Sequence, residues 1–155
     1  MTDNKTLNDI LDKNIAAFDK REINCAETVL LSMCEYMGVD NPLVPRIATA
    51  FGGGMGGSQS MCGAVTGGLM ALGIILGREV GGDQMPCKAL AAQFMRDFLT
   101  EHGALTCMGL TGVNMKDPVE MAAFRAPGGK HHTVCTGCVR WVANYIARVK
   151  EEEGK

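Results

Sequence analysis

The chain has 155 residues, 46% of them hydrophobic and 21% charged, as is ordinary for one globular domain. Its net charge of -2 and its lack of a basic stripe argue against nucleic acid as the partner, because phosphates need Lys and Arg to neutralise them. The first residues lack the basic-then-apolar pattern of a signal peptide, so we expect a cytoplasmic protein.

Apolar residues recur at helical spacing along most of the chain, and no segment alternates as a strand does. Asn24 and Glu27 form a capping-box pattern before one helix, and Gly38 suits its C-terminal stop. We therefore predict an all-α single domain over residues 1–155, a bundle of about five to seven helices with a polar tail at about 150–155. The expected helices span residues 6–20, 25–37, 44–51, 61–77, 84–102 and 135–152, with shorter ones at 104–112 and 118–124.

The segment 51–77 is the stretch around which this bundle is organised. Its first part is too rich in glycine for a helix, whereas residues 61–77 are almost wholly apolar and predict a buried central helix. Gly54, Gly57 and Gly63 are candidate cofactor-binding residues, because glycine lets the backbone take left-handed angles and approach another group closely. The apolar part is at the short limit for a bilayer, and the glycine run would break it, so no membrane span is expected.

Three glycines inside the central helix, Gly67, Gly68 and Gly73, cost it roughly 1 kcal/mol each against alanine. We expect them to allow close packing against a neighbouring helix or a cluster. The same apolar helix with small residues on its surface would also pack against a copy of itself, which predicts a homodimer. The sequence holds no nucleophile–base–acid triad and no phosphate-binding Walker loop, so no catalytic residue is assigned.

Seven cysteines are the most unusual feature of the composition. Without a signal peptide, metal binding or redox work is a better interpretation than structural disulfides. A sulfur at a helix start lies near free N–H groups, which lowers the thiol pKa, and converging helix starts can hold a negatively charged cluster. Cys34 and Cys87 are expected to be small buried hydrophobes. Four others begin predicted helices: Cys25, Cys62, Cys107 and Cys138.

The order of the motifs resembles a known family. A lone cysteine in NCAETVL is followed by the glycine run and by Cys-Gly-Ala-Val-Thr-Gly at residues 62–67. Cys107 then precedes Leu-Thr-Gly, and Cys138 begins the terminal helix. Over residues 23–149 the chain is similar to the C_GCAxxG_C_C family of redox-active proteins. The resemblance implies a redox role, as an electron-transfer or redox-sensing protein with a partner protein that is itself redox-active.

The resemblance also implies a cofactor. A related domain in split-Soret cytochrome c is associated with an iron–sulfur centre of the two-iron type. By this resemblance, an iron–sulfur cluster, 2Fe–2S, would be held here by four cysteine ligands, Cys25, Cys62, Cys107 and Cys138. The haem of that cytochrome is not implied, because haem attachment needs C-x-x-C-H and the residue after Cys138 is Val139.

One segment leaves alternatives open. Cys135 and Cys138 form a C-x-x-C pair preceded by His131 and His132, so Cys135 can replace Cys138 as a ligand or join it. The pair is also typical of cluster-free thiol–disulfide proteins, and together with the histidines it is typical of zinc-binding modules. The two histidines lie in a glycine-flanked loop, where simple exposure explains them as well as ligation does. His102, at a helix end, is explained by the helix dipole.

Overall fold

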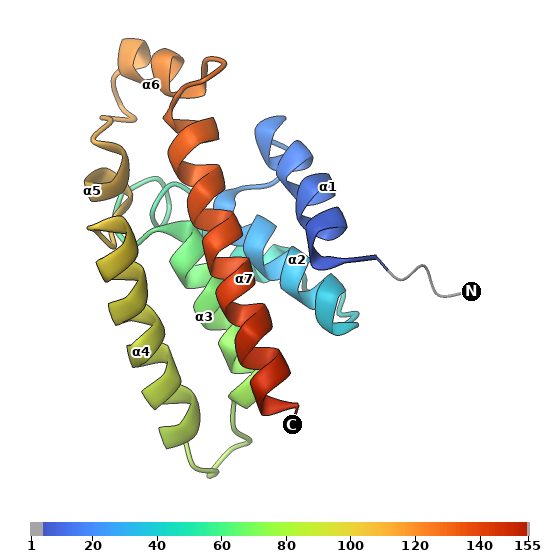
Figure 1. Cartoon of the computed structure of the whole chain (residues 1–155). Helices are drawn as coiled ribbons and strands as arrows, with labels where there is room; N and C mark the ends of the chain where they lie inside the picture. Colours follow the sequence, from blue (N-terminus) through green and yellow to red (C-terminus); the bar gives the residue numbers. More distant parts are fainter. Residues whose placement is uncertain (1–4, 155) are drawn as a thin grey trace.

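A computed structural model describes residues 5–154, and its regular secondary structure consists of helices joined by loops (Figure 1). Within this range no strand forms, and one isolated bridge pairs Met61 with Thr106. The prediction of an all-α protein is confirmed. The α-helices are α1 (Leu7–Asp19), α2 (Cys25–Met37), α3 (Gly63–Leu76), α4 (Met85–His102), α5 (Cys107–Thr111), α6 (Pro118–Arg125) and α7 (Thr136–Glu153), with a 3-10 helix η1 (Arg46–Phe51) and a π-helical turn η2 (His131–Cys135).

Side-chain caps satisfy free backbone N–H groups at the starts of α1, α2, α5 and α6. Asn24 and Glu27 form a reciprocal capping box at the start of α2, and Gly38 ends that helix in the left-handed conformation at φ 67°. Thr6 and Asp9 form a second capping box at the start of α1. The predicted bounds of α2 are confirmed because local side-chain chemistry determines them.

Two segments differ from the sequence-based expectation. The short helix expected at 44–51 is a 3-10 helix that begins only at Arg46, since the prolines before it shape a turn. The sequence predicts a loop that ends where a helix begins at Cys135. Instead, residues 131–135 form a π-helical turn that is continuous with α7. The Thr136 hydroxyl donates to the His131 carbonyl at 3.3 Å across this turn.

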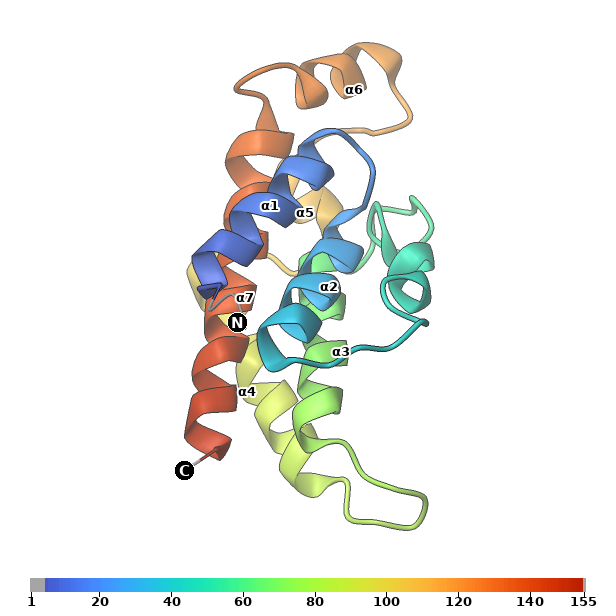
Figure 2. The same cartoon turned by 90° about the vertical axis from the view of Figure 1, so that its right-hand side faces the viewer.

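The long helices lie around α7, which runs the length of the molecule (Figures 1 and 2). α3 and α4 lie on one side of α7, and α1 and α2 pack on another, with α2 also against α3. Both views place α6 and the start of α7 at one end of the bundle, opposite the turn between α3 and α4. The largest fully buried side chains include Leu11, Val29, Met33, Leu72, Phe94, Phe98, Val142 and Ile146.

The central helix α3 is buried over only part of its length. Gly67 and Gly68 lie where added Cβ atoms would reach 2.7 Å from the Ala26 carbonyl oxygen and 2.6 Å from a Val142 methyl group. Gly73 has open space instead, and Ile74 is 42% exposed. The expectation of a wholly buried helix with three packing glycines is therefore wrong at Gly73 and Ile74, where a Cβ added to Gly73 would meet no neighbouring atom within 4 Å. None of the described helices combines the length and apolarity that crossing a membrane requires.

Two alanine substitutions in α3 test this difference. We expect Gly67→Ala to lower the free energy of unfolding by about 1–3 kcal/mol, because overpacking against a backbone carbonyl outweighs the gain in helix propensity. Gly73→Ala, the matched control, should raise it by up to about 1 kcal/mol. Urea unfolding followed by circular dichroism measures both, and equal effects would contradict the packing described.

Candidate functional site

Cysteine side chains converge at the end of the bundle where α2, α3, α5 and α7 begin. They line a nearly closed cavity of about 30 Å³ whose remaining wall is mostly apolar, including Leu110 and Val134. All of the cysteines in the chain are free thiols. The cysteines that line this cavity, called the cysteine cavity below, are Cys25, Cys62, Cys107, Cys135 and Cys138.

Two of the candidate glycines lie against these thiols. A Cβ atom on Gly63 would overlap the Cys25 sulfur, so only glycine lets α3 start this close to α2. Gly54 has φ +73°, and a Cβ there would lie 2.7 Å from the Cys107 Cβ. Gly57 shares the left-handed angle but has open space around it, so it shapes the loop without touching a cysteine.

Backbone hydrogen bonds join the glycine loop to the segment before α5. The Cys62 N–H donates to the Leu105 carbonyl at 2.8 Å, and the Cys107 N–H donates to the Ser60 carbonyl at 2.6 Å. Gln59 adds a side-chain bond, since its carbonyl oxygen accepts from the Met115 N–H at 3.0 Å. These bonds hold the starts of α3 and α5 side by side, and with them the thiols of Cys62 and Cys107.

Burial raises the thiol pKa values, opposite to the sequence-based expectation. It raises the pKa of Cys25 to about 11 and that of Cys107 to about 12, with neighbouring thiols adding to the effect. A hydrogen bond with Cys138, then burial, raises the pKa of Cys62 well above its usual range. Burial also raises the pKa of Cys135.

The expected backbone donors are nevertheless present at two helix starts. N–H groups of Gly53 and Ala26 lower the pKa of Cys25, and those of Ala64 and Val65 lower the pKa of Cys62. They do not outweigh the cost of burying a thiolate in an apolar cavity. The prediction of low pKa values is therefore wrong for Cys25, Cys62 and Cys107, whose thiols keep their protons at neutral pH.

Cys135 and Cys138 do not lie at a free helix start. The π-helical turn before Thr136 continues the helix backwards, so the N–H groups near these residues are already within helical turns. Cys138 is 2% exposed, and both cysteines face the cysteine cavity. The helix-dipole argument thus fails for the C-x-x-C pair, because the π turn was not visible as a pattern in the sequence.

His102 lies beside this centre, and the helix-dipole explanation missed its contacts. Its Nδ1 is 3.9 Å from the Cys138 sulfur, and its ring packs on Phe98 and Trp141. Its Nε2 is buried without a hydrogen-bond partner. A buried N–H without a partner costs more than a bare lone pair, so the favourable tautomer carries the proton on Nδ1, facing the sulfur. Only the packing of α4 against α7 could have revealed this neighbour.

An open pocket lies on the other side of three of the cysteines. Cys25, Cys107 and Cys135 line both the cysteine cavity and a pocket of about 380 Å³. Arg21 and Arg125 also line this outer pocket, together with apolar side chains. The three thiols therefore form a shared wall between a closed cavity and one that solvent can enter.

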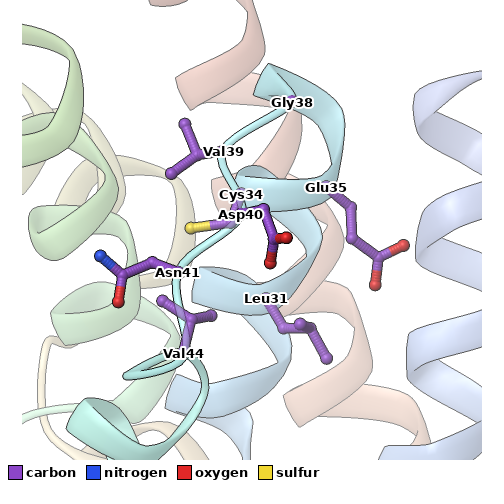
Figure 3. Close-up of a pocket in the computed structure, with 8 residues that line it drawn as sticks. All are labelled: Leu31, Cys34, Glu35, Gly38, Val39, Asp40, Asn41 and Val44. Carbon is purple, nitrogen blue, oxygen red and sulfur yellow. The ribbon is translucent and has the colours of Figure 1, made fainter.

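The two other cysteines lie elsewhere. Cys34 is buried and lines a separate pocket at the end of α2 (Figure 3), as expected for a small hydrophobe. Cys87 is only half-buried, and its thiol lies 3.8 Å from the Leu72 carbonyl oxygen. The expectation of burial is thus confirmed for Cys34 and wrong for Cys87, which lies in the first turn of α4 near the surface.

The sulfurs of the cysteine cavity include one neighbouring pair, Cys62 and Cys138, but no close group of three among the described residues. In the described part of the chain, no three cysteine sulfurs lie within 4.8 Å of one another. A single zinc ion with Zn–S bonds of about 2.3 Å would place its sulfurs about 3.8 Å apart. The spacing is therefore wider than one tetrahedral ion requires.

Comparison with known proteins identifies the family. The chain matches the profile of the family described as "Putative redox-active protein (C_GCAxxG_C_C)" over residues 23–149. The protein belongs to the C_GCAxxG_C_C family. This C_GCAxxG_C_C protein has the redox character of its family, and all the thiols of the cysteine cavity lie within the matched residues. Neither the search of curated proteins nor the search of solved structures finds a match.

The raised pKa values predict how the metal-free protein responds to alkaline pH. The folded state holds the Cys25 proton more tightly than the unfolded chain does, because the pKa rises from 9.0 to about 11 on folding. The resulting stability is complete below about pH 9 and is lost as the pH rises through about 11. Urea unfolding under reducing conditions, from about pH 7 to pH 10.5, should show this decline.

The Cys25→Ser variant supplies the comparison for this titration. It should lose part of the alkaline decline, whereas Cys87→Ser, which changes a thiol outside the cysteine cavity, should keep it. The same pH dependence in the wild-type protein and Cys25→Ser would contradict the assignment of a protonated thiol at this position.

Proposed function

We propose that this protein binds an iron–sulfur cluster, of the 2Fe–2S type, in the cysteine cavity and acts in electron transfer or redox sensing. The observation that supports this most directly is the convergence of five cysteines on one apolar cavity, from the starts of α2, α3 and α5 and from the η2–α7 segment. Thiolates are the usual ligands of iron–sulfur clusters. A buried, apolar surrounding tunes the reduction potential of such a cluster.

The chemistry of the donors fits such a cluster. Thiols with high pKa values are poor nucleophiles, but a metal ion displaces their protons on binding, so burial suits a ligand better than a reactive cysteine. The spacing of the sulfurs favours a polynuclear group over one zinc ion among the cysteines. The zinc-module alternative is therefore weaker at this position.

The size of the cysteine cavity sets a condition on binding. About 30 Å³ is room for one water molecule, so the cysteine side chains must turn outward to admit a cluster. The shared wall offers room for this movement, because Cys25, Cys107 and Cys135 also line the outer pocket. Gly54 and Gly63 already leave the backbone close to two of the thiols.

The residues around the cysteine cavity have defined roles in this proposal. Cys25, Cys62 and Cys107 come from three separate helix starts and would be ligands, with Cys138 or Cys135 as the fourth. When bound, the cluster would supply a one-electron redox couple. The N–H groups at the starts of α2 and α3 would stabilise negative charge on the thiolates, and the apolar wall would exclude water.

Replacing one ligand tests the proposal. Cys62→Ser should lose the visible absorption and most of the iron that the wild-type protein takes up during anaerobic reconstitution, expected at about two atoms per chain. Cys87→Ser should retain both, because Cys87 lies outside the cysteine cavity. Full iron content and an unchanged spectrum in Cys62→Ser would exclude the ligand set. Comparing Cys135→Ser with Cys138→Ser identifies the fourth ligand.

A second candidate function rests on the proximity of Cys62 and Cys138, which line the same cavity and whose thiols interact. These neighbouring thiols could form one S–S bond, releasing two protons and passing two electrons to an oxidant such as a disulfide of a partner protein. Their burial and the raised pKa of Cys62 oppose rapid exchange. A reversible two-electron couple in iron-free protein, lost in Cys138→Ser and kept in Cys25→Ser, would favour this function.

The contact of His102 predicts a tuned potential. A hydrogen bond to a ligating sulfur stabilises the more negative, reduced state. His102→Phe keeps the ring that packs on Trp141 but removes the donor to Cys138, so the midpoint potential of the reconstituted protein should fall. Protein-film voltammetry measures the shift. If the comparison of Cys135→Ser with Cys138→Ser identifies Cys138 as the ligand, an unchanged potential with full iron content would show that the histidine serves packing alone.

A further inference from the structure

We propose that Asp19, His131 and His132 form a second metal site, for a single divalent transition-metal ion such as Zn²⁺, separate from the cysteine cavity. One carboxylate oxygen and two imidazole nitrogens come together where the end of α1 meets the π turn η2. Imidazole with carboxylate is a donor set that zinc and neighbouring transition metals prefer. The cysteines of the nearby C-x-x-C pair are not part of this group.

The distances match the edges of a metal polyhedron. The Asp19 Oδ1 is 3.6 Å from His131 Nε2 and 3.2 Å from His132 Nδ1, and the three atoms all lie within 4.8 Å of one another. Zinc–ligand bonds of about 2.0–2.1 Å in a tetrahedron place neighbouring ligand atoms about 3.3 Å apart. A charge-assisted hydrogen bond is shorter, at about 2.7–2.9 Å. The two distances from the Asp19 oxygen are therefore closer to those between ligands of one metal ion than to a direct hydrogen bond.

His131 supplies an independent observation. It is 8% exposed, and its Nε2 is buried without a hydrogen-bond partner although it faces Asp19. An unpartnered buried nitrogen costs free energy, which coordination of a metal would recover. The ring is also held in place by two aromatic contacts. It stacks on Phe18 with ring centroids 4.2 Å apart, and it packs edge-to-face with Phe124 with centroids 5.6 Å apart. The ligand is thus oriented before any ion binds.

The π turn explains how two adjacent histidines serve one site. Their ring centroids are 5.0 Å apart and their planes are 77° apart, so different ring nitrogens face the same carboxylate oxygen. The side chains of Asp19 and His132 are 38% and 32% exposed, which leaves an entry path and room for water as a further ligand. The site would bind an ion that exchanges with solvent.

Zinc titration of the full chain tests the site, with histidine nitrogen NMR as the readout. Zn²⁺ should shift the ring ¹⁵N signals of His131 and His132 in the wild-type protein. Asp19→Asn should lower the zinc affinity measured from these shifts by at least about tenfold. Even changes to residues that only support a ligand lower metal affinity roughly 10–100-fold. Asp12→Asn, a carboxylate on the same helix that pairs with Arg140, is the matched control and should respond as the wild type does.

The outcomes are separable from those of the cysteine cavity. Zinc held by cysteines alone would leave the histidine signals unmoved and would overturn the proposal, as would an unchanged response in Asp19→Asn. His132→Ala provides a second variant that avoids the Phe18 stack of His131, and it should lose the response as well. Neither readout depends on iron, so loss of the proposed cluster leaves the test intact.

Discussion

The close crossing of α2 and α3 is the constraint on which the rest of the structure depends. Gly63 lies against the Cys25 sulfur and Gly67 against the Ala26 carbonyl, so any side chain at either position would push the two helices apart. Their close approach brings Cys25 and Cys62 to one cavity. Residues of α5 and α7 form other parts of its wall. The stability that these glycines cost α3 as an isolated helix is thus offset by packing and by the geometry of the thiols.

Two electrostatic effects compete at this crossing, and their balance distinguishes a ligand site from a nucleophile site. Helix-start N–H groups favour the thiolates of Cys25 and Cys62, whereas burial disfavours them, and burial is the larger effect. A reactive cysteine needs the opposite balance, with a low pKa and an exposed sulfur. Protonated thiols carry no charge, so their burial needs no compensating ion, whereas thiolates buried at the same place would need one, as in the proposed ligand role.

Local patterns predicted the features that neighbouring residues determine. The capping box at Asn24, the glycine stop at Gly38 and the cysteines at the starts of α2, α3 and α5 follow from residues within one or two turns of each other. Features that depend on distant residues were missed. The contact of His102 with Cys138 needs α4 packed on α7, and the sign of the pKa shifts needs the whole apolar wall. Neither the contact nor the direction of the pKa shifts can be predicted from composition or residue spacing.

The π turn determines how the two histidines lie relative to the C-x-x-C pair. The hydrogen bonds of a π turn join residues five apart, one more than in an α-helix, and each residue of an α-helix turns the chain by about 100°. A regular helix through residues 131–135 would rotate the histidine rings away from Phe18 while Cys135 kept its place. The register of one helix end therefore decides whether the two histidines and the C-x-x-C pair lie close to one another.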